Sequence, residues 1–259
     1  MIVTVTKKAL AGAISLAERI IPSRSATPGL TLVRLDVRGD RLTLSGASHD
    51  ADVETTVTGV EGGGEGSFAM PAHVFAQVVR AAPAQSVELR FGKQLTVHSG
   101  SFKTNIQLVD PSQMPQIEFP EEYSTRVDAA AFARAISSVR YAAAMAEFQA
   151  IFRGLALEQR NGKARLVATD GFRLAYTDLE ADLGLEKPVV VMAKIADELT
   201  RFLGGGEVEI AFPQQRRLSV RGESFRMNLS LMEGNFPDYE RVIPAQFPLQ
   251  VKVRAKEFV

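Results

Sequence analysis

Few side chains in this sequence have the types and spacing that enzyme chemistry requires. The three histidines, His49, His73 and His98, lie far apart and lack the short spacings of metal ligands, and the sequence contains no cysteine. The glycine-rich run at 62–67 lacks the Lys-Ser/Thr ending of a phosphate loop and contains a glutamate, which would repel phosphate. We expect that run to be a flexible turn, and we predict no catalytic residue, no metal and no cofactor.

Asp170 and Asp178 are close enough in sequence to be considered as paired carboxylates for acid–base catalysis. Nothing in the sequence brings a second activating group beside them. A hydrolase built on this pair is kept as an alternative. It requires both carboxylates to lie together in a concave site with a nucleophile or a metal.

The composition indicates a globular chain without an overall charge bias. Hydrophobic residues make up 46% and charged residues 23% of the 259 positions, which is enough apolar material for a core. The 30 basic residues balance the 30 acidic ones, so binding to a polyanion must come from a local excess of charge. No stretch approaches the roughly 20 apolar residues of a membrane span, and the first residues alternate like a strand. We expect a cytoplasmic protein with no membrane partner.

The sequence repeats itself with a period of about 122 residues. One apolar helical stripe occurs twice, as Leu10, Ala13, Ile14 and Ala17 and again as Phe132, Ala135, Ile136 and Val139. A polar segment near the end of each copy also recurs, with Asn105 in the first copy matched by Asn228 in the second. Residue type and order agree along the whole period, so we infer two copies of one unit.

The tail indicates the beginning of a third copy. Residues 251–258 read like residues 3–10, a strand that leads into a helix, and the sequence then stops. A helix that ends at its first apolar anchor cannot bury a face. We therefore expect one unit at 1–121, a second at 122–247 and a truncated third that begins at 248–259, in a natural protein longer by about one repeat.

Each copy contains two smaller βαβββ units. In the first copy, a strand at 2–5 leads to a helix from about Lys7 to Ile21 and then to a hairpin that turns at 38–41. The second half follows the same plan, with a helix at about 71–82 and three strands after it. In the second copy, Asn161-Gly162 suits a tight hairpin turn. Antiparallel sheets covered by helices on one side predict an α+β fold.

The predicted helices carry more basic than acidic side chains. The basic ones are Lys7, Lys8, Arg19, Arg80, Arg134, Arg140, Lys194 and Arg201, and the acidic ones are Glu18, Asp128, Asp197 and Glu198. Because the whole chain is neutral, we expect the strands and loops to carry the compensating acid. The sequence therefore predicts a basic helix layer suited to a polyanion and an acidic strand layer opposite it.

Two segments are the most distinctive. In Ala168-Thr169-Asp170-Gly171-Phe172-Arg173-Leu174-Ala175, a strand ends in the turn pair Asp-Gly, and Phe172 and Leu174 share strand parity and should face one side. The linker Phe236-Pro237-Asp238-Tyr239-Glu240-Arg241-Val242-Ile243-Pro244 is bracketed by prolines that restrict its backbone. Together with the repeat, these segments resemble the bacterial DNA polymerase III β subunit, or sliding clamp, along all 259 residues.

This resemblance implies a DNA-clamp fold with antiparallel sheets outside and helices inside. Family members have three such domains, and two head-to-tail protomers close a ring around double-stranded DNA. The implied partners are the DNA polymerase III alpha subunit and other polymerases, the clamp loader, and repair proteins that display a Gln-Leu-x-Leu-Phe-like peptide. The resemblance thus implies a homodimeric, non-catalytic processivity factor.

The resemblance also implies the site residues. The partner-peptide pocket would contain Phe152, Thr169, Gly171, Phe172, Arg173, Leu174, Pro237, Arg241 and Val242, and DNA would be contacted by Arg24, Arg80, Lys194 and Arg201. The segment 146–151 aligns with a DNA-contacting loop of the family. The alternative is a generic α+β protein-interaction module, which would keep the pocket but lack the basic helix layer.

Overall fold

The structure, a computed structural model, describes residues 1–145, 150–244, 246 and 248–258. The first half contains β1 (Ile2–Thr6), α1 (Lys7–Ala17), β2 (Leu32–Arg38), β3 (Arg41–Ala47), β4 (Ala51–Val57), β5 (Glu61–Gly63), β6 (Glu65–Pro71), α2 (Ala72–Ala81), β7 (Ser86–Phe91), β8 (Gln94–Ser99) and β9 (Phe102–Gln107). The second half contains β10 (Thr125–Asp128), α3 (Ala129–Val139), β11 (Gly154–Arg160), β12 (Lys163–Thr169), β13 (Leu174–Leu179), β14 (Val189–Met192), α4 (Ala193–Leu199), β15 (Glu207–Ala211), β16 (Arg217–Arg221) and β17 (Phe225–Ser230). Apart from β5, each half follows the βαβββ plan twice.

Short 3-10 turns and a final helix complete the description. The turns are η1 (Pro28–Thr31), η2 (Pro111–Gln113), η3 (Arg140–Ala142), η4 (Ala150–Arg153), η5 (Pro213–Gln215) and η6 (Tyr239–Val242), and the last helix is α5 (Ala255–Phe258). Among the described residues, no helix combines the length and the apolar character needed to cross a bilayer.

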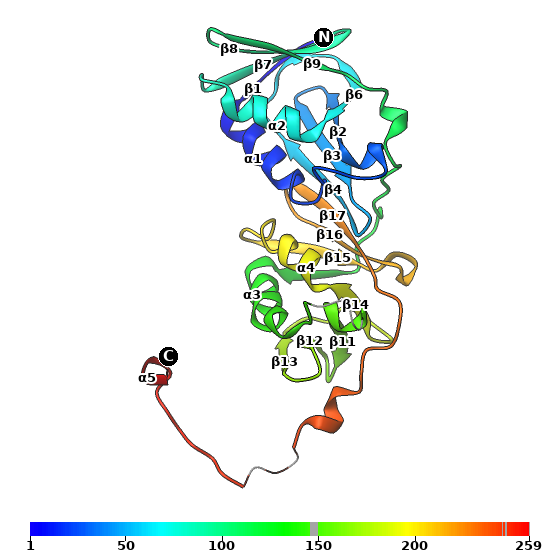
Figure 1. Cartoon of the computed structure of the whole chain (residues 1–259), viewed down its shortest axis with the longest axis vertical. Helices are drawn as coiled ribbons and strands as arrows, with labels where there is room; N and C mark the ends of the chain where they lie inside the picture. The colour runs from blue at the N-terminus through cyan, green and yellow to red at the C-terminus, as the bar shows by residue number, and fades with distance from the viewer. Residues whose placement is uncertain (146–149, 245, 247, 259) are drawn as a thin grey trace.

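Three antiparallel sheets form the framework. Their strand orders are β5-β1-β7-β8-β9, β10-β15-β16-β17-β4-β3-β2-β6 and β13-β12-β11-β14. The middle sheet of eight strands takes four from each half, so the two repeats share one sheet. Helices α1 and α2 of the first half and α3 and α4 of the second follow one another along one side of the molecule (Figure 1). The predicted α+β class, with helices on one side of antiparallel sheets, is confirmed.

The repeat that the sequence predicts is visible in the packing. Both apolar stripes form the buried faces of helices, the first on α1 and the second on α3. Each helix begins at a polar cap in the equivalent place: the Thr6 hydroxyl accepts from the N–H of Ala9, and the Asp128 carboxylate accepts from the N–H of Ala131. Equivalent stripes and caps produce equivalent helices.

The hairpin turns also follow the sequence. Arg38 pairs with Arg41 across the β2–β3 turn, and Arg160 pairs with Lys163 across the β11–β12 turn. Asn161 adopts φ 49° and Gly162 adopts φ 78°, the left-handed backbone that a two-residue turn requires.

Two local predictions were wrong in detail. Helix α1 ends at Ala17 instead of Ile21, because the N–H groups of Arg19 and Ile20 bond three residues back and tighten the chain into a turn before Pro22. The glycine-rich run is not a flexible turn: part of it is β5, which pairs with β1. A side chain at Gly62, where φ is +107°, would collide with the β1 backbone, so glycine permits this close pairing.

The tail fits its prediction only in part. The helix is present as α5, but residues 251–254 form no strand in the described part of the chain. A strand needs a neighbour to bond its backbone groups, and no described strand pairs with this segment. Leu249, Val251 and Val253 are accordingly exposed, although they alternate with polar residues as a strand would.

A buried polar cluster fixes the junction between the two halves. Strands β17 and β4 pair so that Asn228 lies opposite Asp52. The Asn228 side-chain amide donates to Asp52 (3.2 Å) and to the backbone carbonyl of Glu118 (2.9 Å), and its oxygen accepts from the Ser219 hydroxyl (2.7 Å). Arg217 donates to the same Asp52 carboxylate. Since Asp52, Ser219 and Asn228 are all buried, a shift in register would leave these three side chains without their partners.

We predict that Asn228→Ala lowers the free energy of unfolding by about 1–3 kcal/mol, because it removes three hydrogen bonds, including the one made by the buried Ser219 hydroxyl. Urea unfolding followed by circular dichroism measures the loss. The repeat provides a matched control in Asn105→Ala, since Asn105 on β9 is exposed and, within the described part of the chain, its side chain bonds only to Thr96. Equal losses in the two variants would contradict a specific role for the junction cluster.

Candidate functional site

The turn between β12 and β13 holds its shape through its own hydrogen bonds. The Thr169 hydroxyl donates to the Arg173 carbonyl (2.7 Å) and accepts from the Gly171 N–H (3.1 Å). One Asp170 carboxylate oxygen accepts from the N–H groups of Phe172 and Arg173, both at 3.0 Å. Gly171 has φ +90°, which suits glycine. This ordered turn presents Phe172 with its side chain 99% exposed.

Strand parity did not predict the surroundings of Phe172 correctly. Phe172 lies in the turn, before the first residue of β13, so the alternation of a strand does not apply to it. Leu174 does begin the strand, and it is half-buried against a small apolar cluster. The two side chains therefore lie in different environments.

The linker after β17 packs on the same apolar cluster. The buried members of this cluster are Ala156, Val167, Val190 and Tyr239, and the half-buried residues around them are Ile151, Leu174, Met232, Phe236 and Ile243. The cluster therefore joins β13, the linker and η4, which contains Phe152. The carbonyl of Phe152 accepts from the N–H of Ala144 (2.8 Å), and this bond ties η4 to the end of the helix layer.

The other predicted pocket residues lie along η6 and its approach. Pro237 is half-buried, Val242 is 70% exposed, and Arg241 pairs with Asp238 at 2.7 Å while remaining open to solvent. The structure thus brings Leu174 to the same apolar cluster as Phe236 and Ile243, the linker residues that flank Pro237 and Arg241. It leaves Phe172 and Val242 as exposed apolar groups that a partner could cover.

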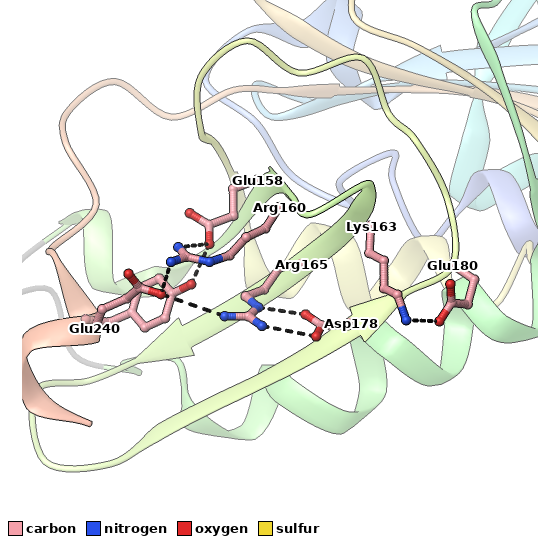
Figure 2. Close-up of polar contacts among 8 residues, drawn as sticks. Glu158, Arg160, Lys163, Arg165, Asp178, Glu180 and Glu240 are labelled. Atoms are coloured by element: carbon pink, nitrogen blue, oxygen red, sulfur yellow. Dashed lines mark hydrogen bonds and ion pairs between the residues drawn. The ribbon is translucent and has the colours of Figure 1, made fainter. Parts of the chain in front are cut away.

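Beside this cluster lies a group of charged residues that the sequence did not predict (Figure 2). Arg165 on β12 donates to the Asp178 carboxylate of β13 through two bonds of 2.6 and 3.0 Å. Arg165 also lies 3.9 Å from Glu240 of η6, to which Arg160 of β11 is bound at 2.5 Å. The Tyr239 hydroxyl donates to Glu158 of β11. The Arg165–Asp178 pair joins two strands of the sheet, and the contacts of Glu240 and Tyr239 join the linker to the sheet.

These contacts change the acidity of the groups involved. The hydrogen bonds from Arg165 lower the pKa of Asp178, so this carboxylate is ionised at neutral pH. Burial, together with the bond to Glu158, raises the pKa of Tyr239 to about 12, so its hydroxyl keeps the proton that it donates. The backbone N–H groups of Phe172 and Arg173 lower the pKa of Asp170.

The structure does not support a hydrolase built on Asp170 and Asp178. Asp170 caps the turn before β13, and Asp178 lies near the other end of that strand, paired with Arg165. Asp178 lies four positions after Leu174, the first residue of β13, or about 13 Å away at the usual rise. Both carboxylates have lowered pKa values, which suits neither a general acid nor a raised-pKa base. Within the described residues, no cluster of metal-ligating side chains is found.

On the helix side, the two halves meet around a groove of about 350 Å³. Arg19, in the turn after α1, pairs with Glu198 of α4 at 3.0 Å. Lys194 of α4 and Ser23 both line the groove, so Lys194 lies near the loop that carries Arg24. Two cations predicted to contact DNA, which come from different repeats, are therefore brought to one surface.

The other two predicted DNA contacts differ from each other. Arg201 follows α4 and is exposed. Arg80 is bound by the Glu18 carboxylate at 2.6 Å, which offsets its charge and raises its pKa. In the segment 146–151, residues 146–149 lie outside the described residues.

The expected acidic strand layer was wrong. Strands β2 and β3 carry Arg34, Arg38 and Arg41, and basic and acidic side chains on the strands are nearly balanced. Many of them pair across the sheets, as Arg226 does with Glu54 at 2.5 Å. Counting charges along the sequence could not separate strands from loops, so the acidic residues that balance the helices were wrongly assigned to the strands.

Sequence reasoning also missed Glu158, Arg165 and Tyr239. Asp178 was considered only as a catalytic group, whereas its partner is the arginine opposite it in the β12–β13 register. The alternation of charged and apolar residues in β11 and β12 was the available signal. It could be interpreted only once the linker was known to cross this sheet.

Two sequence families match the chain. The DNA polymerase III beta subunit N-terminal domain matches residues 1–118, and the central domain of the same subunit matches residues 126–238. The two matches follow the two repeats and lie on either side of the connection at 119–125.

Individual relatives agree with the family matches. The beta sliding clamp of Pseudomonas aeruginosa is 29% identical over 248 residues, which cover 93% of this chain and 67% of the relative. The beta sliding clamp of Bacillus subtilis is 24% identical over 270 residues, which cover 99% of this chain and 71% of the relative.

Solved structures show the same fold. The DNA polymerase III subunit beta of Pseudomonas aeruginosa superposes with a TM-score of 0.87 at 27% identity, covering 95% of this chain and 69% of the other. The beta subunit of Thermotoga maritima gives a TM-score of 0.83 at 28% identity, with 95% and 68% covered. Beta sliding clamps are non-catalytic processivity subunits, as the sequence predicted for this chain. The chain belongs to the family of bacterial DNA polymerase III beta subunits, the sliding clamps.

Proposed function

We propose that the full-length protein encircles duplex DNA as a head-to-tail homodimer and tethers polymerases, the clamp loader and repair proteins through a peptide-binding pocket. We further propose that residues 1–121 and 122–247 are its first two domains and that residues 248–259 begin a third. The cytoplasm, where replication takes place in bacteria, is the proposed location.

The observation that carries the proposal is the junction between β4 and β17. By the repeat, β9 is the counterpart of β17 and β13 is the counterpart of β4. Both β9 and β13 end their sheets in the part of the chain that the structure describes. Each of these edge strands is therefore equivalent to one of the two strands that pair in the β4–β17 junction. Further units of the same plan could pair with these edges and extend the arrangement until it closes.

The helix side supports a role in DNA binding. Helices α1, α2, α3 and α4 lie on one side of the sheets, which would become the inner wall of a closed ring (Figure 1). Lys194, Arg24 and Arg201 are exposed there and come from both repeats. Phosphate contacts of this kind carry no base specificity, so a ring held by topology can slide.

The outer face supports partner tethering. Phe172 and Val242 are exposed, and their chain neighbours Leu174 and Ile243 pack on one apolar cluster, an arrangement that a short apolar peptide could cover. Burial of each peptide side chain contributes roughly 1.5–3 kcal/mol before ordering costs, which gives weak and exchangeable binding. A generic interaction module would use the same pocket but would not need the exposed cations on the helices.

We predict that Phe172→Ala weakens binding of a synthetic Gln-Leu-x-Leu-Phe peptide by about tenfold or more, because the peptide loses a large apolar contact. Fluorescence anisotropy measures the affinity, and circular dichroism checks the fold. Val74→Ala removes an exposed apolar side chain from α2 and serves as the control. Unchanged affinity in the Phe172 variant would contradict the pocket.

We predict that Lys194→Glu weakens binding to a short DNA duplex. The fall of log affinity with log salt concentration should also become less steep, by about one unit of slope. Titration at several salt concentrations measures both quantities. Lys93→Glu makes the same charge change in the β7–β8 turn, away from the helices, and should leave the slope unaltered. An unchanged affinity and slope for Lys194→Glu would count against DNA contact by the helix side.

A further inference from the structure

The linker crosses the outer face of the second half without filling the space beneath it. A groove of about 530 Å³ lies between the linker and strands β11 and β14, and it is lined by Glu158, Val190, Met232 and Tyr239 among others. An unfilled space provides no van der Waals contacts to hold the chain above it. The position of the linker therefore depends on the apolar contacts that Phe236, Tyr239 and Ile243 make beside this groove and on a small number of polar attachment points.

One attachment point is a set of polar contacts that we name the polar latch: Glu158, Arg160, Arg165, Tyr239 and Glu240. Tyr239 donates to Glu158, and Glu240 is bound by Arg160 at 2.5 Å, with Arg165 at 3.9 Å. Figure 2 shows Arg165 between Asp178 and Glu240, with these side chains directed toward one another from the sheet and from η6. The latch therefore joins β11 and β12 to the linker.

The sheet side of the latch is itself held in place. Arg165 is 16% exposed, makes two bonds to Asp178 and lies 4.7 Å from the centre of the Tyr176 ring. A planar guanidinium fixed by a carboxylate and a ring loses little freedom when it also faces Glu240. Burial keeps the Tyr239 hydroxyl protonated, so it can donate to Glu158 over the whole neutral range.

The latch residues are direct chain neighbours of the proposed pocket wall. Pro237 precedes Tyr239 by two positions, and Arg241 and Val242 follow Glu240 in the same 3-10 turn. One turn of helix moves as a unit, so a displacement at Tyr239 or Glu240 displaces the wall. No latch side chain is among the residues that would touch the peptide.

We propose that the polar latch is a positioning device, which holds Pro237, Arg241 and Val242 in the geometry that a partner peptide needs. This inference rests on the proposed peptide-binding function. Both contact points are needed, because the Tyr239 bond sets how closely η6 approaches the sheet and the Glu240 pair sets the orientation of η6 on the sheet. Loss of either lets the turn move over the groove beneath it.

The test uses the 259-residue chain with Tyr239→Phe, which removes one hydroxyl, and Glu240→Gln, which removes one exposed charge. We expect each variant to bind the synthetic Gln-Leu-x-Leu-Phe peptide about 3- to 10-fold more weakly, mainly through faster dissociation. Hydrogen exchange of the amides at 236–243 should become faster in both, while exchange in β11 and β12 stays as in the unsubstituted chain. Faster exchange throughout the sheet would instead indicate a purely structural role and overturn the proposal.

A matched control lies on the same face of the sheet. Lys163 on β12 pairs with Glu180, and this pair lies apart from Glu240 of the linker (Figure 2). Lys163→Met should leave peptide affinity and exchange at 236–243 unchanged, and an effect equal to that of the latch variants would overturn the proposal.

The outcomes also separate this inference from the proposed function. If the unsubstituted chain binds the peptide, Phe172→Ala loses it, and both latch variants bind normally, the latch proposal is overturned and the pocket stands. If the unsubstituted chain does not bind the peptide, the proposed pocket fails, and faster exchange at 236–243 in the latch variants still shows that the latch positions the linker.

Discussion

The antiparallel ladder between β4 and β17 is the interaction on which the rest of the molecule depends. It joins strands from two repeats into one eight-stranded sheet, and its register is fixed by the buried Asn228 and Asp52. A slip of one residue would turn the apolar face of β17 toward solvent and leave the polar cluster unpaired. The relative position of the two helix pairs follows from this ladder, because each pair packs on its own part of the framework.

The ladder also gives the molecule two different sides. One side carries the helices and collects exposed cations from both repeats, including Lys194 and Arg24. The other side carries strands whose arginines are largely matched by carboxylates, as Arg226 is by Glu54. Unmatched cations can attract phosphates, whereas matched ones mainly hold neighbouring strands and linkers together. This division suits a protein that binds DNA with one side and partner proteins with the other.

Partner binding, as proposed, depends on two short segments that do not belong to any sheet. The β12–β13 turn is ordered by its own Thr169 and Asp170 bonds, so it needs little help from the rest of the fold. The linker differs, because it has prolines but no regular structure beyond η6, and it takes its position from Tyr239 and the charged residues of the sheet below. One wall of the proposed pocket is therefore ordered by its own residues, and the other is held by residues that are distant in the sequence.

The sequence by itself determined the helix stripes, their repetition and the Asn161-Gly162 turn, because each depends on residues close together along the chain. Through a family resemblance it also indicated the segments of the proposed pocket. Only the tertiary structure decided that Asp178 pairs with Arg165, that Arg80 is offset by Glu18, and that Tyr239 bonds to Glu158. These pairings join residues that are distant in sequence, and their charges meet only after strand register and linker path are set. Local pattern fixes elements, whereas the partners of polar groups are a property of the folded arrangement.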